Sequence, residues 1–171
     1  MKRVFTLIAC FFVLFASCKK DKNQAPAYYV TADVDGTSFN FTSNNLARLM
    51  KGKNGGSLAT NSELSLYGAT RIDQDADAIS IVISEPATTI GTGTYTGGVD
   101  DSRFVSIQYL IGPFSASAPN EYVSDLSDGG MAVKITSIDN NTVQGTFRGT
   151  LYHNGSEKSI TNGKFNLPIN Q

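Results

Sequence analysis

Apolar and polar residues alternate along most of the chain after residue 27, and this period of two predicts β-strands with one buried face. The alternation is clear at 28–34, 64–67, 79–84 and 131–136. Turn-forming residues separate these segments, as Asp35-Gly36 does after the first of them. Short strands at even spacing, punctuated by Gly, Asn and Asp, predict an all-β fold.

The segment 143–169 is predicted to form a hairpin. Its inward face is expected to carry Val143, Phe147, Leu151, Phe165, Leu167 and Ile169. Its outward face is expected to carry Gln144, Thr146, Arg148, Thr150 and Tyr152. Asn154-Gly155 suits a type I′ turn, in which both central residues need positive φ, and the return strand is expected from about Ser159.

Three segments depart from this simple pattern. Segment 104–111 is apolar on both phases, which suggests a strand buried on both faces or lying near an edge of two layers. The segment 43–51, SNNLARLMK, is expected to form a helical turn or two. The segment 91–98, GTGTYTGG, is interpreted as a strand flanked by turns, since it lacks the Lys and the following helix that a phosphate-binding loop requires.

Residues 28–171 are therefore expected to form one antiparallel β-sandwich domain, immunoglobulin-like or related, with a closed or partly open β-barrel as the alternative. A chain of this size buries about 68–70% of its surface on folding, so it can be stable without disulfides.

The N-terminal residues are typical of an export signal. Lys2 and Arg3 precede the apolar run 4–16, which has the length of a signal-peptide core and is too short for a membrane-spanning helix. The run ends in LFASCKK, with small residues before Cys18, and this resembles a bacterial lipoprotein signal. The resemblance implies a signal peptide at 1–17. It also implies that residues 18–27 consist of an acylated Cys18 followed by a polar tether. The alternative is a soluble secreted protein cleaved near Ala16-Ser17.

Charge and cysteine content narrow the function classes. The formal net charge is -1, and removal of residues 1–17 would take away Lys2 and Arg3 and change it to -3. A nucleic-acid partner would need a clustered basic surplus, so none is expected. Cys10 would leave with the signal, so no cysteine besides Cys18 would remain for a disulfide, a metal or catalysis.

No catalytic residues are predicted, and we expect no enzyme activity. His153 is the single histidine and is interpreted as a solvated residue beside a hairpin turn. Nucleophilic catalysis would need a partner for it, and none of the usual motifs is present. Four glutamates lie beside turns or strand ends with nothing to pair them as glycosidase carboxylates: Glu63, Glu85, Glu121 and Glu157.

One constellation has the character of a metal site. Asp73, Asp75 and Asp77 alternate, and hard oxygen ligands suit Ca²⁺, although Ala78 and Ser84 stand where an EF-hand loop needs Gly and Glu. An acidic connection between two strands is the favoured interpretation, so no metal or other cofactor is expected. The carboxylates that a true site would have to recruit are Asp100, Asp101, Asp125 and Asp128.

Ligand-binding residues are not assigned by the sequence. Trp is absent, so exposed tyrosines are the available stacking groups, namely Tyr67, Tyr95 and Tyr152. Each is interpreted as a half-buried surface residue.

Longer segments carry a resemblance to a family. VTADVDGTSFNF at 30–41, GTGTYTGG at 91–98 and VQGTFRGTLYHNGSEKSITNGKFNLPI at 143–169 resemble small Bacteroidota lipoproteins whose all-β domain has no known function. The resemblance implies an exported protein anchored to the outer membrane by its N-terminal lipid, periplasmic or surface-facing. We expect a binding role with a protein or glycan partner. The alternatives are a structural or adhesive envelope component and an accessory domain of an enzyme.

Overall fold

The computed structural model describes residues 28–52, 61–73, 75–86, 89–97, 104–113, 120–125 and 130–170. The expected signal peptide at 1–17, Cys18 and the tether to residue 27 lie outside these residues. The described part of the chain is all β, as predicted, and none of it forms a helix of the length and hydropathy that crossing a membrane requires.

Eleven strands form one sheet. They are β1 (Tyr29–Val34), β2 (Thr37–Phe41), β3 (Ser43–Met50), β4 (Ser62–Ala69), β5 (Ala78–Glu85), β6 (Gly93–Thr96), β7 (Phe104–Leu110), β8 (Glu121–Ser124), β9 (Ala132–Ile138), β10 (Thr142–His153) and β11 (Ser156–Asn170). Their order is β2-β1-β11-β3-β4-β5-β7-β8-β10-β9-β6, and β10 also pairs with β11. All pairings are antiparallel except the short parallel contact of β11 with β3.

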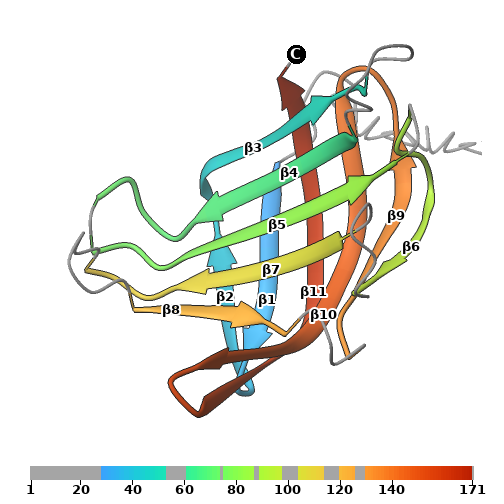
Figure 1. Ribbon diagram of the computed structural model, residues 1–171. Coiled ribbons are helices and arrows are strands. Elements are labelled where there is room, and N and C mark those ends of the chain that lie inside the picture. Colours follow the sequence, from blue (N-terminus) through green and yellow to red (C-terminus); the bar gives the residue numbers. More distant parts are fainter. Residues whose placement is uncertain are drawn as a thin grey trace, which may run out of the picture.

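The sheet folds over into two layers that cross each other (Figure 1). Strands β3, β4, β5, β7 and β8 form one layer, and β2, β1, β11, β10, β9 and β6 form the other. Because β11 meets β3 and β10 meets β8, the pairings run in a continuous ring through both layers. The architecture is therefore a two-layer β-structure that corresponds to the predicted sandwich or to a partly open barrel.

The two longest strands join the layers. One edge of β11 pairs first with β1 and then, at Ile169 and Asn170, with β3. The free edge of β10 pairs first with β9 and then, at Leu151 and Tyr152, with β8. Register shifts interrupt the β10–β11 and β1–β11 ladders near Asn162, which has φ 53°. Such bulges bend a strand, and here the bend lets β11 pass from one layer to the other.

The core lies between the layers and is lined by the inward face of every long strand. The predicted inward residues of the hairpin are all buried, and so are the alternate apolar residues of β1, β4, β5 and β9. Phe39 and Phe41 of β2 pack edge-on against Tyr109 of β7, across the interior. The phases predicted for these strands are confirmed.

The two predicted hairpin turns are also confirmed. Asp35 and Gly36 have φ of 50° and 79°, and Asn154 and Gly155 have φ of 47° and 80°. Positive φ at both central residues is the type I′ geometry, which matches the twist of the strands on either side. The strand predicted within 91–98 is β6, and β11 begins at Ser156, slightly before the expected start.

One expectation for an individual segment is wrong, and for another segment one of the two expected alternatives, burial on both faces, is not found. The segment 43–51, expected to contain helical turns, forms β3, because β4 pairs along its length and β11 pairs at Ala47 and Arg48. The segment 104–111 forms β7, which buries one face only: Val105, Ile107 and Tyr109 point inward, whereas Phe104 is exposed. In both cases the tertiary partners, and not the local pattern, decide the outcome.

Candidate ligand-binding surface

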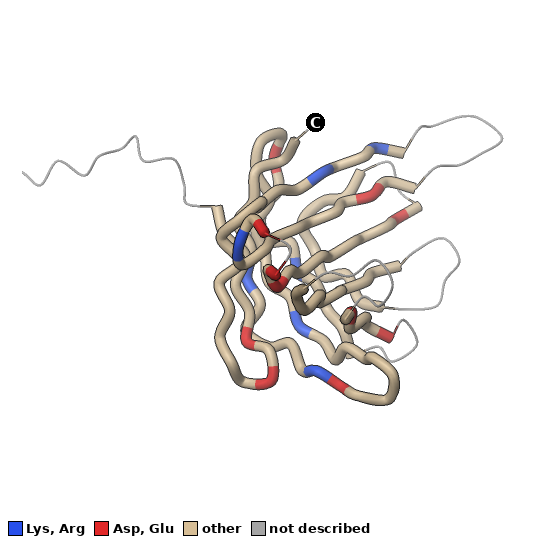
Figure 2. The backbone as a smooth tube through the Cα atoms, turned by 90° about the vertical axis from the view of Figure 1, so that its left-hand side faces the viewer, with Lys and Arg blue, Asp and Glu red and all other residues tan. Residues whose placement is uncertain are grey.

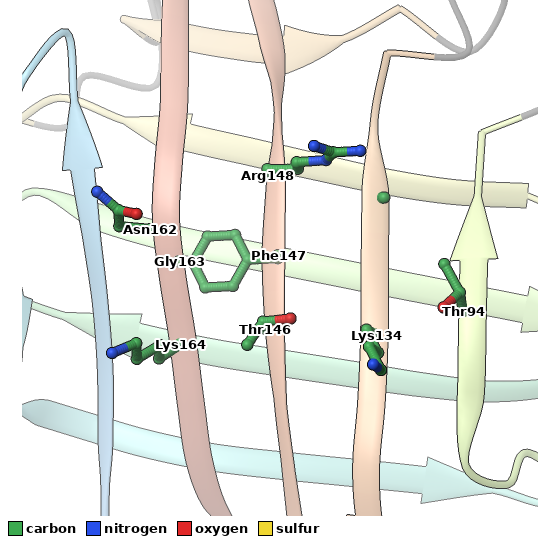
Figure 3. A pocket seen from close by; sticks show the side chains of 9 residues that line it. Thr94, Lys134, Thr146, Phe147, Arg148, Asn162, Gly163 and Lys164 are labelled. Atoms are coloured by element: carbon green, nitrogen blue, oxygen red, sulfur yellow. The ribbon is translucent and has the colours of Figure 1, made fainter.

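The outer face of β6, β9, β10 and β11 is hollowed into a shallow concavity of about 470 Å³. Its lining residues are Thr94, Ala132, Lys134, Thr146, Phe147, Arg148, Asn162, Gly163 and Lys164. We call the six outward polar residues of this set the basic face: Thr94, Lys134, Thr146, Arg148, Asn162 and Lys164. Figure 3 shows them projecting from four neighbouring strands.

Strand register places the side chains of this face. Lys134 of β9 pairs with Thr146 of β10, which in turn pairs with Lys164 of β11. Arg148 follows Thr146 by two residues and therefore points to the same side of the sheet. Three cationic residues thus occupy positions next to Thr146 on the outward side of the sheet.

The floor of the concavity comes from a glycine. Gly163 pairs with Phe147, and a Cβ on Gly163 would overlap the Phe147 carbonyl oxygen and ring. Figure 3 shows the Phe147 ring beside Gly163, between the two strands. Phe147 is nevertheless 3% exposed, so the floor is the edge of a core residue, and polar side chains form the rim.

The charges of the basic face are not neutralised by the described part of the protein. None of Lys134, Arg148 and Lys164 takes part in an ion pair there, whereas Arg71 pairs with Asp73 and Lys158 pairs with Asp35. Figure 2 shows long uncharged stretches of strand between the charged positions. The three cations of the basic face therefore keep their capacity for an anionic ligand.

One carboxylate borders this surface. Asp33 of β1 accepts hydrogen bonds from Asn162 Nδ2 at 2.7 Å and from Ser38 Oγ at 2.6 Å. These two bonds, that from Asn162 first, lower the pKa of Asp33 below its usual value, so the group is ionised at neutral pH. Asp33 thus places a negative charge at the edge of the basic face, on the β1 side.

A second hollow, of about 680 Å³, lies where β11 ends. It is lined by Lys51, Asn140, Asn141, Ile169 and Asn170. It offers a single cation among neutral groups, so it has less to hold a charged ligand than the basic face.

His153 is a structural residue and not the solvated side chain expected from the sequence. It is half-buried, and its Nδ1 lies 2.7 Å from the carbonyl oxygen of Glu121 in β8. The Asn154 side-chain amide lies 3.0 Å from Nε2, and the imidazole packs on the Tyr122 ring. Nδ1 therefore carries the proton and Nε2 accepts, a tautomer assigned from these partners. The imidazole fastens the hairpin to β8.

The three alternating aspartates, Asp73, Asp75 and Asp77, make separate contacts. Asp77 accepts hydrogen bonds from the Tyr109 hydroxyl at 2.8 Å and from the Gly112 amide at 3.1 Å. Asp73 pairs with Arg71 and accepts the amide of Asp75. No group of three metal-ligating side chains is found among the described residues. Of the carboxylates that a site would have to recruit, Asp125 follows β8, and Asp100, Asp101 and Asp128 lie outside the described residues.

The Asp77 bond has an electrostatic consequence for its partner. Burial first, and then the hydrogen bond to the Asp77 carboxylate, raise the pKa of the Tyr109 phenol above its usual value. The phenol stays protonated and donates, so Asp77 holds the loop after β7 against the core.

The remaining sequence candidates do not converge. Tyr95 uses its hydroxyl to bond the amide and the carbonyl of Gly91, and Tyr67 packs against the small cluster around Ala76. Tyr152 is half-buried, as expected. The glutamates lie on four different strands: Glu63 on β4, Glu85 on β5, Glu121 on β8 and Glu157 on β11. Glu85 is buried, while its neighbour Glu63 points the other way and accepts the Ser65 hydroxyl.

Sequence reasoning missed two of the three cations. Arg148 was placed on the outward face of the hairpin, but Lys134 and Lys164 were not connected with it. Lys134 alternates with buried Val133 and Ile135, so its outward direction was readable; its place beside β10 was not.

Comparisons with known proteins add no relative: no protein-family model, no curated protein and no solved structure matches this chain.

Proposed function

We propose that this protein is a lipid-anchored component of the cell envelope, exported and held at the outer membrane through Cys18, and that its β-domain binds a ligand on the basic face. The sequence 1–18 supports the anchor, because small residues precede the cysteine after an apolar run. The anchor also supplies what a binding domain at a membrane needs, which is a fixed position relative to its ligand.

The observation that carries the binding role is the unneutralised charge around the concavity. Lys134, Arg148 and Lys164 form no ion pair with any described residue, whereas exposed Arg71 and half-buried Lys158 do. The cations stand on strands and not on loops, so their backbones are held in fixed relative positions before a ligand arrives. Pre-organisation of this kind reduces the entropic cost of binding.

The test is a binding screen of the full chain against arrays of glycans and peptides. The wild type is compared with the triple variant Lys134→Ala/Arg148→Ala/Lys164→Ala. Arg48→Ala/Lys51→Ala, which removes exposed cations on and next to β3, serves as the control. We expect at least one class of probe to bind the wild type and the control and to be lost in the triple variant. If every probe treats the three proteins alike, the binding role of this face is wrong.

A further inference from the structure

The basic face has a regular chemical pattern across the strands. Thr94, Lys134, Thr146, Lys164 and Thr31 stand in one register row over β6, β9, β10, β11 and β1. Hydroxyl and ammonium groups therefore alternate along a line perpendicular to the strands. Since neighbouring strands lie about 4.8 Å apart, the backbones of Lys134 and Lys164 are about 10 Å apart.

Arg148 adds a third charge beside this row. It lies two residues beyond Thr146 on β10, which is about 7 Å along the strand. Its guanidinium reaches toward β9 in Figure 3, whereas the Lys164 side chain reaches toward β1. The three charges are thus spread over the surface and do not converge on one point.

The spacing selects the kind of anion. With the Arg148 and Lys164 side chains reaching in opposite directions, as Figure 3 shows, a single phosphate or carboxylate group does not contact both of them. A ligand that engages all three must carry several negative charges distributed along its length. Its long axis then follows the row Lys134–Thr146–Lys164, across the strands.

The uncharged side chains between the three cations indicate which class of polyanion fits this surface. The groups there are the hydroxyls of Thr94 and Thr146 and the amide of Asn162. Protein partners are held chiefly by aromatic and arginine anchors in desolvated pockets. Here the one aromatic side chain is Phe147, which is buried. Hydroxyl and amide groups suit the hydroxyls of sugars, since both sides can donate and accept.

We infer that the basic face binds a linear anionic polysaccharide, with its acidic groups on Lys134, Lys164 and Arg148 and its hydroxyls on the intervening threonines. This inference rests on the proposed binding function and specifies its ligand class. The strands β1, β6, β9, β10 and β11 contain two acidic residues, Asp33 and Glu157, and Glu157 lies in the hairpin arm opposite Tyr152. Among the residues of these five strands, Asp33 is therefore the carboxylate that repels a polyanion at this surface.

The test measures the affinity of the full chain for alginate, a carboxylated polysaccharide, with dextran as the neutral counterpart. We expect alginate to bind and dextran not to bind. The double variant Lys134→Ala/Lys164→Ala should weaken alginate binding by about fivefold or more, since each exposed ion pair contributes a fraction of a kcal/mol to about 1 kcal/mol. The control Arg48→Ala/Lys51→Ala should bind as the wild type does.

Asp33→Asn provides a variant of the opposite sign. Removing this carboxylate should tighten alginate binding by about twofold, because a repulsion is lost. A loss of fold would weaken binding and cannot mimic this gain. Raising the salt concentration should weaken binding in all variants and reduce the differences between them.

Three results would overturn the inference. The first is equal binding of alginate by the wild type and the lysine variant. The second is displacement of alginate by inorganic phosphate at equal anion concentration, which would show a site for a single anion. The third is a face that retains dextran or a peptide but not alginate; that result leaves the proposed binding function standing and removes the polyanionic ligand.

Discussion

At the scale of single residues, the central hairpin is organised by two reciprocal pairs of glycine and phenylalanine. Phe165 of β11 stands opposite Gly145 of β10, and Phe147 of β10 stands opposite Gly163 of β11. A Cβ on Gly145 would overlap the Phe165 ring, as one on Gly163 would overlap the Phe147 ring. Each ring thus covers the glycine across from it, and the two rings pack on each other with centroids 6.4 Å apart.

Phe147→Ala should lower the free energy of unfolding by about 3–5 kcal/mol, because a buried ring is lost and a cavity remains. Arg148→Ala, next in sequence but exposed, should change it by less than about 0.5 kcal/mol. Chemical denaturation of both variants measures the difference. Similar losses in the two would contradict the observed strand phase.

Gly163→Ala should also destabilise the protein, by about 1–3 kcal/mol, since the added methyl group overlaps the Phe147 backbone and ring. Gly91→Ala is the matched control, because nothing lies within 4 Å of the Cβ position there and φ is not in the left-handed region. Thermal melting compares the two. A Gly163→Ala protein as stable as the control would mean that β10 can move away from β11 without cost.

At the scale of elements, the turn after β1 is held by its first residue. Asp35 Oδ1 accepts the Ser159 amide of β11 at 2.9 Å, and Oδ2 pairs with Lys158 at 3.0 Å. Lys158 also lies over the Tyr122 ring of β8. One aspartate thus links the β1–β2 turn to the same hairpin that His153 ties to β8.

This link predicts acid sensitivity. The hydrogen bond from the Ser159 amide, followed by that from Lys158, lowers the pKa of Asp35 below its usual value. The stabilisation is complete above the unfolded-state pKa and disappears as the pH falls through the folded-state pKa. Asp35→Asn should therefore cost less than about 1 kcal/mol at neutral pH and nothing at strongly acidic pH. Asparagine tolerates the positive φ of this position, so the backbone is kept.

Melting curves of the wild type and Asp35→Asn from neutral pH down to about pH 2 make the comparison, a range set by the unperturbed aspartate pKa. The two melting temperatures should converge on acidification. Parallel curves would mean that Asp35 titrates alike in the folded and unfolded states.

The loop before β5 predicts no response to calcium. Both Asp77 oxygens hold protein donors, and Asp73 is occupied by Arg71 and by the Asp75 amide. The melting temperature should therefore agree within about one degree in millimolar Ca²⁺ and in chelator, whereas binding at 100 Kd would add about 2.7 kcal/mol of stability. A calcium-dependent rise that is lost in Asp75→Asn would make this loop a metal site.

Local signals in the sequence predict many of the strands and turns. Alternation sets the buried face of most strands, and Asp35-Gly36 and Asn154-Gly155 set the turns, because both depend on neighbours in the chain. The strand β3 was not predictable in this way. Its outward face carries exposed Leu46 and Met50, and its inward face carries Ala47 and partly buried Leu49. Its extended form is imposed by β4 and β11.

At the scale of the whole molecule, the candidate site is a product of topology. Lys134 and Arg148 come together because β9 and β10 pair, and Lys164 joins them through the β10–β11 ladder. Nothing in the spacing of three isolated cations along the sequence distinguishes them from any solvated charge. Register, which depends on the complete fold, makes them one surface.

The proposed membrane anchor concerns the whole chain and has its own test. A labelled fatty acid should be incorporated into the wild-type protein in a bacterial host and not into Cys18→Ala, which should also keep its signal segment. Stable anchoring takes more than one acyl chain, so the wild type should fractionate with membranes. Equal labelling of the two proteins would contradict the lipoprotein prediction.

The placement of β11 beside both β1 and β3 also governs when the protein can fold. The strand β1 is the first described strand to be synthesised, and one of its partners, β11, is the last. The strand β3 also pairs with β11. Closing loops of that length costs entropy before any stabilising contact forms. This cost slows folding in chains dominated by pairings between distant residues. A nascent chain that lacks residues 156–170 leaves β1, β3 and β10 each without one partner, although β2, β4 and β9 can still pair with them. The ring of pairings that joins the two layers therefore closes only after synthesis of the last described strand.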